Sequence, residues 1–288
     1  MDNDIDILQK LKNNYLHLSK SHKKIADYIL DNYEKAAFMT AQRLGEMVGA
    51  SEATVVRFAY LMGFDSYPRF KKALQDIIKI KLTTIQRIDM SQGRLNNKYL
   101  IQNILNSDIE NIRYTLDELK HEEFEKVISL INESNSIYII GFRTTKILTE
   151  YLGYYLNLIH NNVKVITYGV GDIYEEIIKA QKGDLVIGIS FPRYSSKTYE
   201  TIKYLKDKGL FIVGITDNER SPITRLSNHC LIAKSNIISF VDTLVAPLSL
   251  MNAIIVAVGL SNKDKIKEVF HELEYLWEQH EIYANEDE

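Results

Sequence analysis

Cysteine, proline and tryptophan are scarce in this chain, whose 288 residues include one cysteine, four prolines and one tryptophan. The lone thiol of Cys230 excludes an internal disulfide and lacks the partners of a cysteine metal site. Its place in the apolar run 230–233 favours a buried structural residue over a nucleophile. The seven histidines are scattered without metal-ligand spacing, so we expect no metal site and no cofactor.

Long apolar runs are also absent. No stretch approaches the roughly 18 residues that span a bilayer, and the longest apolar run, 253–260, is interpreted as a buried helix. The acidic start, residues 1–6, differs from the basic start of a signal peptide. We therefore expect a cytoplasmic protein without a membrane partner, in keeping with a single free thiol.

The net charge of −3 is unevenly distributed. Residues 1–82 hold 13 Lys and Arg against 10 Asp and Glu, whereas residues 263–288 hold 3 against 9. A modestly basic N-terminal region fits contact with phosphates, and the acidic end is most simply a solvated helix. With 45% hydrophobic and 25% charged residues, the composition is that of a globular protein long enough for two domains.

Residues 40–63 have the spacing of a helix-turn-helix, two short helices that cross at a tight turn. Gly45 is small where the helices would approach most closely, and Gly49 lies where the first helix must end in a left-handed conformation. The apolar positions that would face each other are Leu44, Val48, Val55 and Phe58. A plain helical hairpin is the structural alternative, but the spacing favours a second helix that binds double-stranded DNA.

Candidate DNA contacts lie at the start of this second helix. Ser51 is expected to cap it, so that the side chains of the first turns point away from the core. Thr54 and Arg57 are candidates for base edges, because arginine reads guanine through two hydrogen bonds. Ser51 and Glu52 are candidates for phosphate and cytosine respectively, although Glu52 is equally explained as a capping residue.

A further helix is expected after Gly63, with Pro68 near its start, where the missing N–H is not needed. Three of its residues are predicted to hold the DNA backbone without reading sequence, namely Tyr67, Arg69 and Lys71. Three nearby aromatic residues are better explained as core than as stacking platforms: Phe58, Phe64 and Phe70.

The pattern predicts an all-α helix-turn-helix domain over residues 1–82 and an α/β domain over residues 120–288. Residues 83–98 lose their apolar period and are interpreted as a linker, followed by a helix at 99–119 that connects the domains or assists dimerisation. From residue 121, short β-rich runs alternate with helical segments, which indicates a five-stranded parallel, doubly wound sheet of flavodoxin-like order. The predicted strands are 136–141, 163–168, 184–190, 210–216 and 229–233.

Two loops of this α/β domain share a composition. In such a sheet, ligands bind beside strands one and three, and the loops leaving them here are 141–145 and 190–196. Both place an arginine and hydroxyl residues at a helix N-terminus, which favours an anion. The candidate ligands to the anion are Arg143, Thr144, Thr145, Ser190, Arg193, Ser195 and Ser196. Surface or interdomain salt bridges are the alternative explanation for the two arginines.

Residues 51–58 (Ser-Glu-Ala-Thr-Val-Val-Arg-Phe) and 61–71 (Leu-Met-Gly-Phe-Asp-Ser-Tyr-Pro-Arg-Phe-Lys), together with the two loops and the Gly-Ile-Thr-Asp run at 214–217, resemble a known family. This family is that of the RpiR/MurR-type bacterial transcription regulators, in which a helix-turn-helix domain precedes a sugar-isomerase (SIS) domain that senses a ligand, commonly a phosphorylated sugar. The SIS resemblance covers about residues 120–260.

The resemblance implies that Thr145 matches the hydroxyl residue that binds phosphate at the first SIS helix. Ser190 and Ser195 match the first serine and the threonine of the Ser-x-Ser-Gly-x-Thr loop. The chain departs from the pattern where arginines replace glycines at 143 and 193, and where Pro192 replaces a serine. Arginine brings a forked, always-charged donor, so a sugar phosphate and another anionic metabolite both remain candidate effectors.

The hypothesis from the sequence is a regulator that binds palindromic operator DNA as a dimer, with homodimer or tetramer left open. The small anionic effector is expected to bridge Arg143 and Arg193. Asp242 accepts a hydrogen bond from the ligand or from an arginine in this interpretation, and a helix-capping role is an equal alternative.

A sugar-phosphate isomerase with a helical N-terminal extension is the alternative function. Isomerisation needs a general acid and base, and the two loops contain neither histidine nor carboxylate. Elsewhere in the domain, His160, His229 and Glu150 each have an ordinary structural explanation. The sequence therefore predicts no catalytic residue and no enzyme.

Overall fold

Strands alternate with helices in the C-terminal part of the chain, as predicted. The computed structural model describes residues 7–81, 83–92, 97–167, 172–236 and 240–283. Its contacts divide the chain into two compact units, Met1–Asp89 and Met90–Glu288. Each unit is described by itself.

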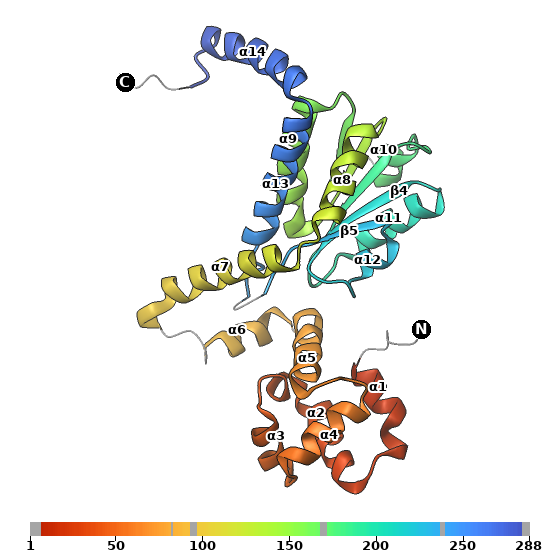
Figure 1. Cartoon of the computed structure of the whole chain (residues 1–288), viewed down its shortest axis with the longest axis vertical. Helices are drawn as coiled ribbons and strands as arrows, with labels where there is room; N and C mark the ends of the chain where they lie inside the picture. The colour runs from red at the N-terminus through yellow and green to blue at the C-terminus, as the bar shows by residue number, and fades with distance from the viewer. Residues whose placement is uncertain (1–6, 82, 93–96, 168–171, 237–239, 284–288) are drawn as a thin grey trace. The chain divides into compact units, whose positions relative to one another are not determined.

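The described residues of the first unit form helices and their connections (Figure 1). The helices are α1 (Ile7–Asn14), α2 (Lys20–Ala36), α3 (Ala41–Val48), α4 (Glu52–Leu61), α5 (Tyr67–Lys81) and the start of α6 (Thr84–Gln92), with a short 3-10 turn, η1, at Tyr15–His17. Phe58 and Phe70 are fully buried and meet edge to face, with ring centroids 5.9 Å apart. The prediction that they belong to the core is confirmed.

The helix-turn-helix geometry follows from its small and capping residues. Thr40 and Ser51 cap α3 and α4 by accepting hydrogen bonds from the N–H groups of residues three positions on. Gly49 ends α3 with φ 66°, the left-handed region that glycine enters at little cost. A Cβ on Gly45 would lie 2.6 Å from the carbonyl oxygen of Ala50, so only glycine fits where the chain returns into α4.

Replacing this glycine tests the close approach. Gly45→Ala should lower the free energy of unfolding by about 1–3 kcal/mol, because the obstructing atom belongs to the backbone and must move. Gln42→Ala, at an exposed position of the same helix, should change it by at most about 0.5 kcal/mol. Chemical denaturation of the two variants measures the difference, and equal stability would contradict the crowding.

Residues 84–92 correct one expectation, since they form α6 rather than irregular linker. The helix starts at a reciprocal pair that the apolar period does not reveal. The Thr83 hydroxyl accepts from the N–H of Gln86, and the Gln86 side chain accepts from the N–H of Thr83. This capping box satisfies two N–H groups at the helix start, and Gln86 also donates to Glu34 of α2.

The second unit contains a five-stranded, all-parallel sheet in the order β2-β1-β3-β4-β5, which confirms the predicted flavodoxin-like order. The strands are β1 (Ile137–Ile140), β2 (Val163–Ile166), β3 (Leu185–Ile189), β4 (Phe211–Thr216) and β5 (His229–Ile232). Alternate residues of a strand face opposite sides. Accordingly, Ile137 and Ile139 belong to one core cluster, while Tyr138 and Ile140 belong to the other.

Helices cover both faces of this sheet (Figure 1). On one face pack α8 (His121–Glu133), α9 (Lys146–Ile159) and α13 (Val245–Ser261), and on the other pack α10 (Ile173–Ile177), α11 (Ser196–Asp207) and α12 (Pro222–Leu226). The remaining elements are η2 (Asn97–Tyr99), α7 (Leu100–Glu118), η3 (Arg143–Thr145) and α14 (Lys263–Gln279). Helix α7 packs against α13, so the helix predicted as a connector belongs to the second unit.

Helices α13 and α14 meet at a bend of 101°. Within the described ranges, no single helix has the length and apolar character needed to cross a membrane; this bent pair meets the criterion only when its two halves are taken together.

A carboxylate joins α8 to the edge strand β5. Glu123 Oε1 accepts from His229 Nδ1 at 2.9 Å and from the backbone N–H of Cys230 at 3.1 Å. Burial opposes ionisation of Glu123, but these two hydrogen bonds, together with the charges of His229 and Lys126, outweigh it and lower the pKa of its carboxyl. The neighbouring Cys230 thiol has its pKa raised to about 11, chiefly by burial.

The lowered pKa predicts a stability contribution that depends on pH. Glu123 stabilises the fold above its ordinary pKa of about 4.3, and this contribution is lost as the pH falls through the lowered folded-state pKa. Glu123→Gln should therefore destabilise the protein at pH 7, and its difference from wild type should shrink toward pH 3. Urea unfolding across this range measures the difference, with Glu122→Gln, an exposed position one residue away, as the control. A difference that stays constant with pH would contradict the assignment.

Candidate DNA interface and effector site

The outward face of α4 holds most of the predicted base-contacting residues. Ser51, Glu52 and Arg57 are exposed, and Thr54 is half-buried. The Ser51 hydroxyl accepts from the N–H of Thr54 at 3.2 Å and is hydrogen-bonded to its hydroxyl at 2.8 Å. Both hydroxyls therefore serve the helix cap, and Arg57 is an exposed cationic side chain of this face. The pKa of His22 is lowered chiefly by burial and, to a smaller extent, by the positive charge of Arg57.

Tyr60 shares this outward face and was missed by the sequence reasoning. Its side chain is 56% exposed, and it lies seven residues after Ala53 and three after Arg57. Residues three, four and seven apart share one side of a helix, so this spacing was the signal that could have found it.

Among the residues predicted to hold the DNA backbone, Tyr67 is corrected. Its ring is buried, and its hydroxyl donates to the carbonyl of Met39 at 3.1 Å. Burial also raises the pKa of this hydroxyl to about 12. Tyr67 therefore ties α5 to the connection between α2 and α3, and its hydroxyl proton is engaged there. Arg69 is exposed and paired with Asp65 at 2.5 Å, and Lys71 is half-buried.

The two predicted effector loops leave neighbouring strands at the same edge of the sheet. Residues 141–145 follow β1, residues 190–196 follow β3, and these two strands are paired in register. Both loop arginines have left-handed backbones, with φ 62° at Arg143 and φ 55° at Arg193, and both side chains are exposed. Non-glycine residues rarely adopt this conformation. Glycine adopts this conformation at the least cost, so an arginine at each position needs contacts that hold its backbone there.

The hydroxyl residues of the loops differ in their surroundings. Thr145 is buried and donates to the carbonyl of Phe142 at 2.8 Å, whereas Thr144 and Ser196 are exposed. Ser195 caps α11 by accepting from the N–H of Thr198. Ser190 is buried, and its N–H donates to Ile215 of β4 at 3.1 Å.

Additional polar contacts that the sequence reasoning missed hold the loops in place. The buried Thr198 hydroxyl accepts from the N–H of Phe142, which joins α11 to the residue before Arg143. The Tyr194 hydroxyl donates to Asp217 Oδ1 at 2.7 Å and accepts from Asn218 Nδ2 at 3.0 Å. The residue that follows Arg193 is thus anchored to the loop after β4. The sequence signal that could have found this anchor was Asp217, which directly follows a predicted strand in the Gly-Ile-Thr-Asp run.

Asp242 lies half-buried in the segment between β5 and α13. The N-cap residue of α13 is Leu244, whose side chain makes no capping hydrogen bond, and the N–H of Val245 donates to the Thr243 hydroxyl at 3.5 Å. The adjacent Thr243 hydroxyl donates to Asp108 of α7 at 2.6 Å.

The residues weighed for catalysis have structural partners outside the two loops. His160, which precedes β2, donates from Nε2 to the carbonyl of Ser134 at 2.9 Å. His229 begins β5 and is bonded to Glu123, and Glu150 is paired with Lys146 on α9 at 3.3 Å. Across the ranges that the structure covers, no three His, Cys, Asp or Glu side chains are placed to hold a metal ion.

Comparison with known proteins agrees with both units. Residues 5–80 match the helix-turn-helix domain of the rpiR family, and residues 130–257 match the SIS domain. An uncharacterized HTH-type transcriptional regulator of Haemophilus influenzae is 26% identical over 240 residues, 79% of each chain. One of Clostridium perfringens is 25% identical over 276 residues, which cover 92% of this chain and 94% of that one.

Two solved structures share the fold. The sugar isomerase domain of an RpiR transcription factor from Sphaerobacter thermophilus is 22% identical with a TM-score of 0.59, covering 62% of this chain and 99% of that one. The Vibrio vulnificus NanR protein complexed with ManNAc-6P is also 22% identical with a TM-score of 0.57, covering 97% and 100%. A helix-turn-helix unit joined to a SIS unit defines a DNA-binding transcription regulator. The two units of this chain match, in the same order, the helix-turn-helix domain of the rpiR family and the SIS domain.

Proposed function

We propose that this regulator binds operator DNA as a dimer through α4 and responds to a small anion held at the carboxyl ends of β1 and β3. The observation that carries the proposal is the pair of left-handed arginines, Arg143 and Arg193, on loops of two adjacent strands. Backbone strain of this kind persists where the surrounding structure enforces it, and it is concentrated at functional sites.

The chemistry of arginine defines the class of effector. Each guanidinium presents a planar fork of donors that matches a carboxylate or a phosphate, and it stays charged at any physiological pH. Exposed hydroxyls at Thr144 and Ser196 add donors beside the two arginines. A sugar phosphate, as in the NanR complex, and a small carboxylate both satisfy this arrangement.

The arginine site is tested by removing one of the two guanidinium groups. Arg193→Gly keeps a residue that accepts φ 55° while deleting the guanidinium, so the backbone conformation of the loop should be retained. Loss of a charge-assisted pair should weaken anion binding by about tenfold or more. Arg225→Ala, an exposed arginine before β5, is the control.

The measurement is the affinity of the protein for its promoter DNA, by fluorescence anisotropy, with N-acetylmannosamine 6-phosphate, glucose 6-phosphate or succinate added. Wild type and Arg225→Ala should show a changed DNA affinity with at least one anion, and Arg193→Gly should not. A normal response of Arg193→Gly, or no response of wild type to any anion, would overturn the arginine site.

For DNA, the outward face of α4 supports the division of roles expected from the sequence. Two copies of α4 in a two-fold dimer would enter successive major grooves of a palindromic site. Arg57 is exposed on this face and suits bidentate contact with guanine. Lys71 on α5 suits phosphate contact, while Tyr67 is withdrawn from the contact set because its hydroxyl is bonded to Met39.

One arginine variant and one lysine variant separate contact with the bases from contact with the DNA backbone. Arg57→Ala should cost about 1–3 kcal/mol on the preferred site and relax the sequence preference, whereas Lys71→Ala should weaken all sequences and lower the salt dependence. Binding to sites selected from a random DNA pool, measured at several salt concentrations, distinguishes the two effects. Indistinguishable behaviour of the two variants would contradict this assignment.

We infer that the site senses its ligand without converting it. Proton transfer requires a group within hydrogen-bond reach of the substrate, and the two loops supply arginines and hydroxyls only. The candidate histidines, His160 and His229, lie at the amino ends of β2 and β5, at the sheet edge opposite the loops. These placements support regulation over isomerisation.

A further inference from the structure

A surface helix usually buries apolar side chains and exposes polar ones. Helix α7, by contrast, turns polar side chains toward the rest of the second unit. Asn111 and Thr115 are 0% and 8% exposed, whereas Ile101 and Leu116 on the same helix are 69% and 71% exposed. Buried polar groups are expensive unless they are hydrogen-bonded. The face of α7 turned toward the unit must therefore be matched by specific partners.

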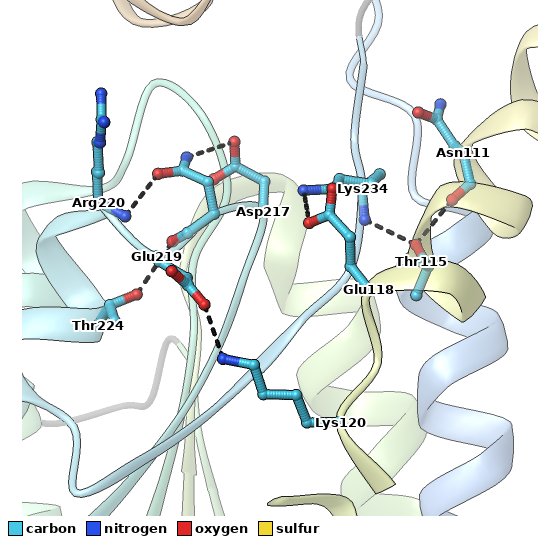
Figure 2. Close-up of polar contacts among 10 residues, drawn as sticks. Asn111, Thr115, Glu118, Lys120, Asp217, Glu219, Arg220, Thr224 and Lys234 are labelled. Carbon is cyan, nitrogen blue, oxygen red and sulfur yellow. Dashed lines mark hydrogen bonds and ion pairs between the residues drawn. The ribbon is translucent and has the colours of Figure 1, made fainter. Parts of the chain in front are cut away.

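Those partners are backbone groups of the segment that follows β5, of which Figure 2 shows Lys234 beside Thr115. The Asn111 side chain accepts from the N–H of Asn236 at 3.0 Å and donates to its carbonyl at 3.3 Å. The Thr115 hydroxyl accepts from the N–H of Lys234 at 2.8 Å and donates to the carbonyl of Asn111 at 2.7 Å. The two side chains thus satisfy the main chain at two positions of an irregular segment.

The same helix holds this segment at two further points. Glu118 forms an ion pair with the side chain of Lys234 (Figure 2). Asp108 accepts from the Thr243 hydroxyl, and Thr243 in turn accepts from Ser235 through its carbonyl at 2.9 Å. Residues 108, 111, 115 and 118 lie along one side of a helix. Asp242, a predicted effector ligand, is the neighbour of Thr243.

A second connection leads from the end of α7 toward the Arg193 loop. Lys120 pairs with Glu219 at 3.0 Å, and the adjacent Asn218 is hydrogen-bonded to Tyr194 (Figure 2 shows the Lys120–Glu219 pair). Both partners of this ion pair are largely exposed, and exposed pairs contribute little to stability. The buried contacts of Asn111 and Thr115 are therefore the ones expected to control the docking.

We propose that α7 is part of the effector-sensing apparatus, with Asn111 and Thr115 acting as positioning residues. They hold the backbone of Lys234 and Asn236 after β5, and Asp108 of the same helix holds Thr243, the neighbour of Asp242. This inference rests on the proposed function, because it concerns the same anion site. Its consequence is that effector binding and the docking of α7 are thermodynamically coupled.

Coupling of this kind is reciprocal. If docked α7 strengthens anion binding by some factor, the bound anion strengthens the docking of α7 by the same factor. When the segment after β5 moves, the buried polar groups of Asn111 and Thr115 lose their partners, which weakens the docking of α7. Helix α7 begins at Leu100, shortly after the boundary between the two units at residues 89–90. The coupling therefore reaches the part of the chain that leads to the DNA-binding unit.

The test uses a pair of nearly isosteric changes in the full-length protein. Thr115→Val removes the hydroxyl that Lys234 needs and keeps the shape, whereas Thr115→Ser keeps the hydroxyl. Asn111→Leu removes the amide that pairs with Asn236, and Asn103→Leu makes the same change at an exposed position of α7. N-acetylmannosamine 6-phosphate and inorganic phosphate are the probes, with affinity measured by calorimetry.

Thr115→Val and Asn111→Leu should bind the probe about three- to tenfold more weakly, while Thr115→Ser and Asn103→Leu should bind as wild type does. Hydrogen exchange supplies a readout that a merely structural role would not change. The probe should slow amide exchange across residues 108–118 in wild type, and it should do so less in Thr115→Val.

The outcomes separate this inference from the proposed function. If wild type binds a probe but the exchange of α7 is unchanged, or if Thr115→Val binds normally, α7 has no part in sensing. If wild type binds neither of these probes, and neither glucose 6-phosphate nor succinate, the proposed anion site fails and the inference falls with it. Equal loss of affinity in Thr115→Val and Thr115→Ser would assign the effect to packing and would also overturn the role of the hydroxyl.

Discussion

Parallel strand order is the constraint on which the rest of the second unit depends. All five strands end at one edge, and β1 lies between β2 and β3. The chain therefore leaves β1 toward one face of the sheet and β3 toward the other, where α9 and α11 pack into separate core clusters. The diverging loops open a crevice at this point in any sheet of this order. Both arginines, the Asp217 anchor and the segment held by α7 follow strands that end at this edge.

The left-handed arginines show how such a crevice is specialised. A left-handed backbone costs a residue with a Cβ about 1–2 kcal/mol, so each position needs contacts that prevent relaxation. At Arg193 the next residue, Tyr194, is anchored to Asp217, and at Arg143 the preceding residue, Phe142, is bonded to Thr198. Contacts with neighbouring segments thus compensate for the strained backbone at each arginine. These contacts hold both loops in the conformation that carries the guanidinium groups.

Much of the fold could be predicted because it follows from local rules. Strands with continuous apolar runs, such as 185–189, are what a sheet covered on both faces requires. Gly45, Gly49 and the caps at Thr40 and Ser51 locate the helix-turn-helix without any tertiary information. The start of α6 was also encoded locally, in the Thr83 and Gln86 pair, but the reasoning from apolar period alone could not detect it.

The remaining features could not be predicted because they depend on contacts between distant segments. Tyr67 has the composition of a DNA-contacting residue, and only its bond to Met39 shows that it faces inward. Asn111 looks like a surface residue of a helix until Asn236 is placed beside it, 125 positions along the chain. Polar residues carry no period that distinguishes a solvated face from one that binds backbone, so such docking becomes visible only in three dimensions.

The single thiol has a practical consequence for spectroscopy. Burial raises the pKa of the Cys230 thiol to about 11, so at neutral pH this residue is overwhelmingly the thiol, whereas the thiolate is the reactive form. A cysteine introduced at an exposed position of α4 or α7 would therefore react with a maleimide dye far faster than the native one. Cys230 therefore need not be replaced before a fluorophore is attached at an introduced cysteine.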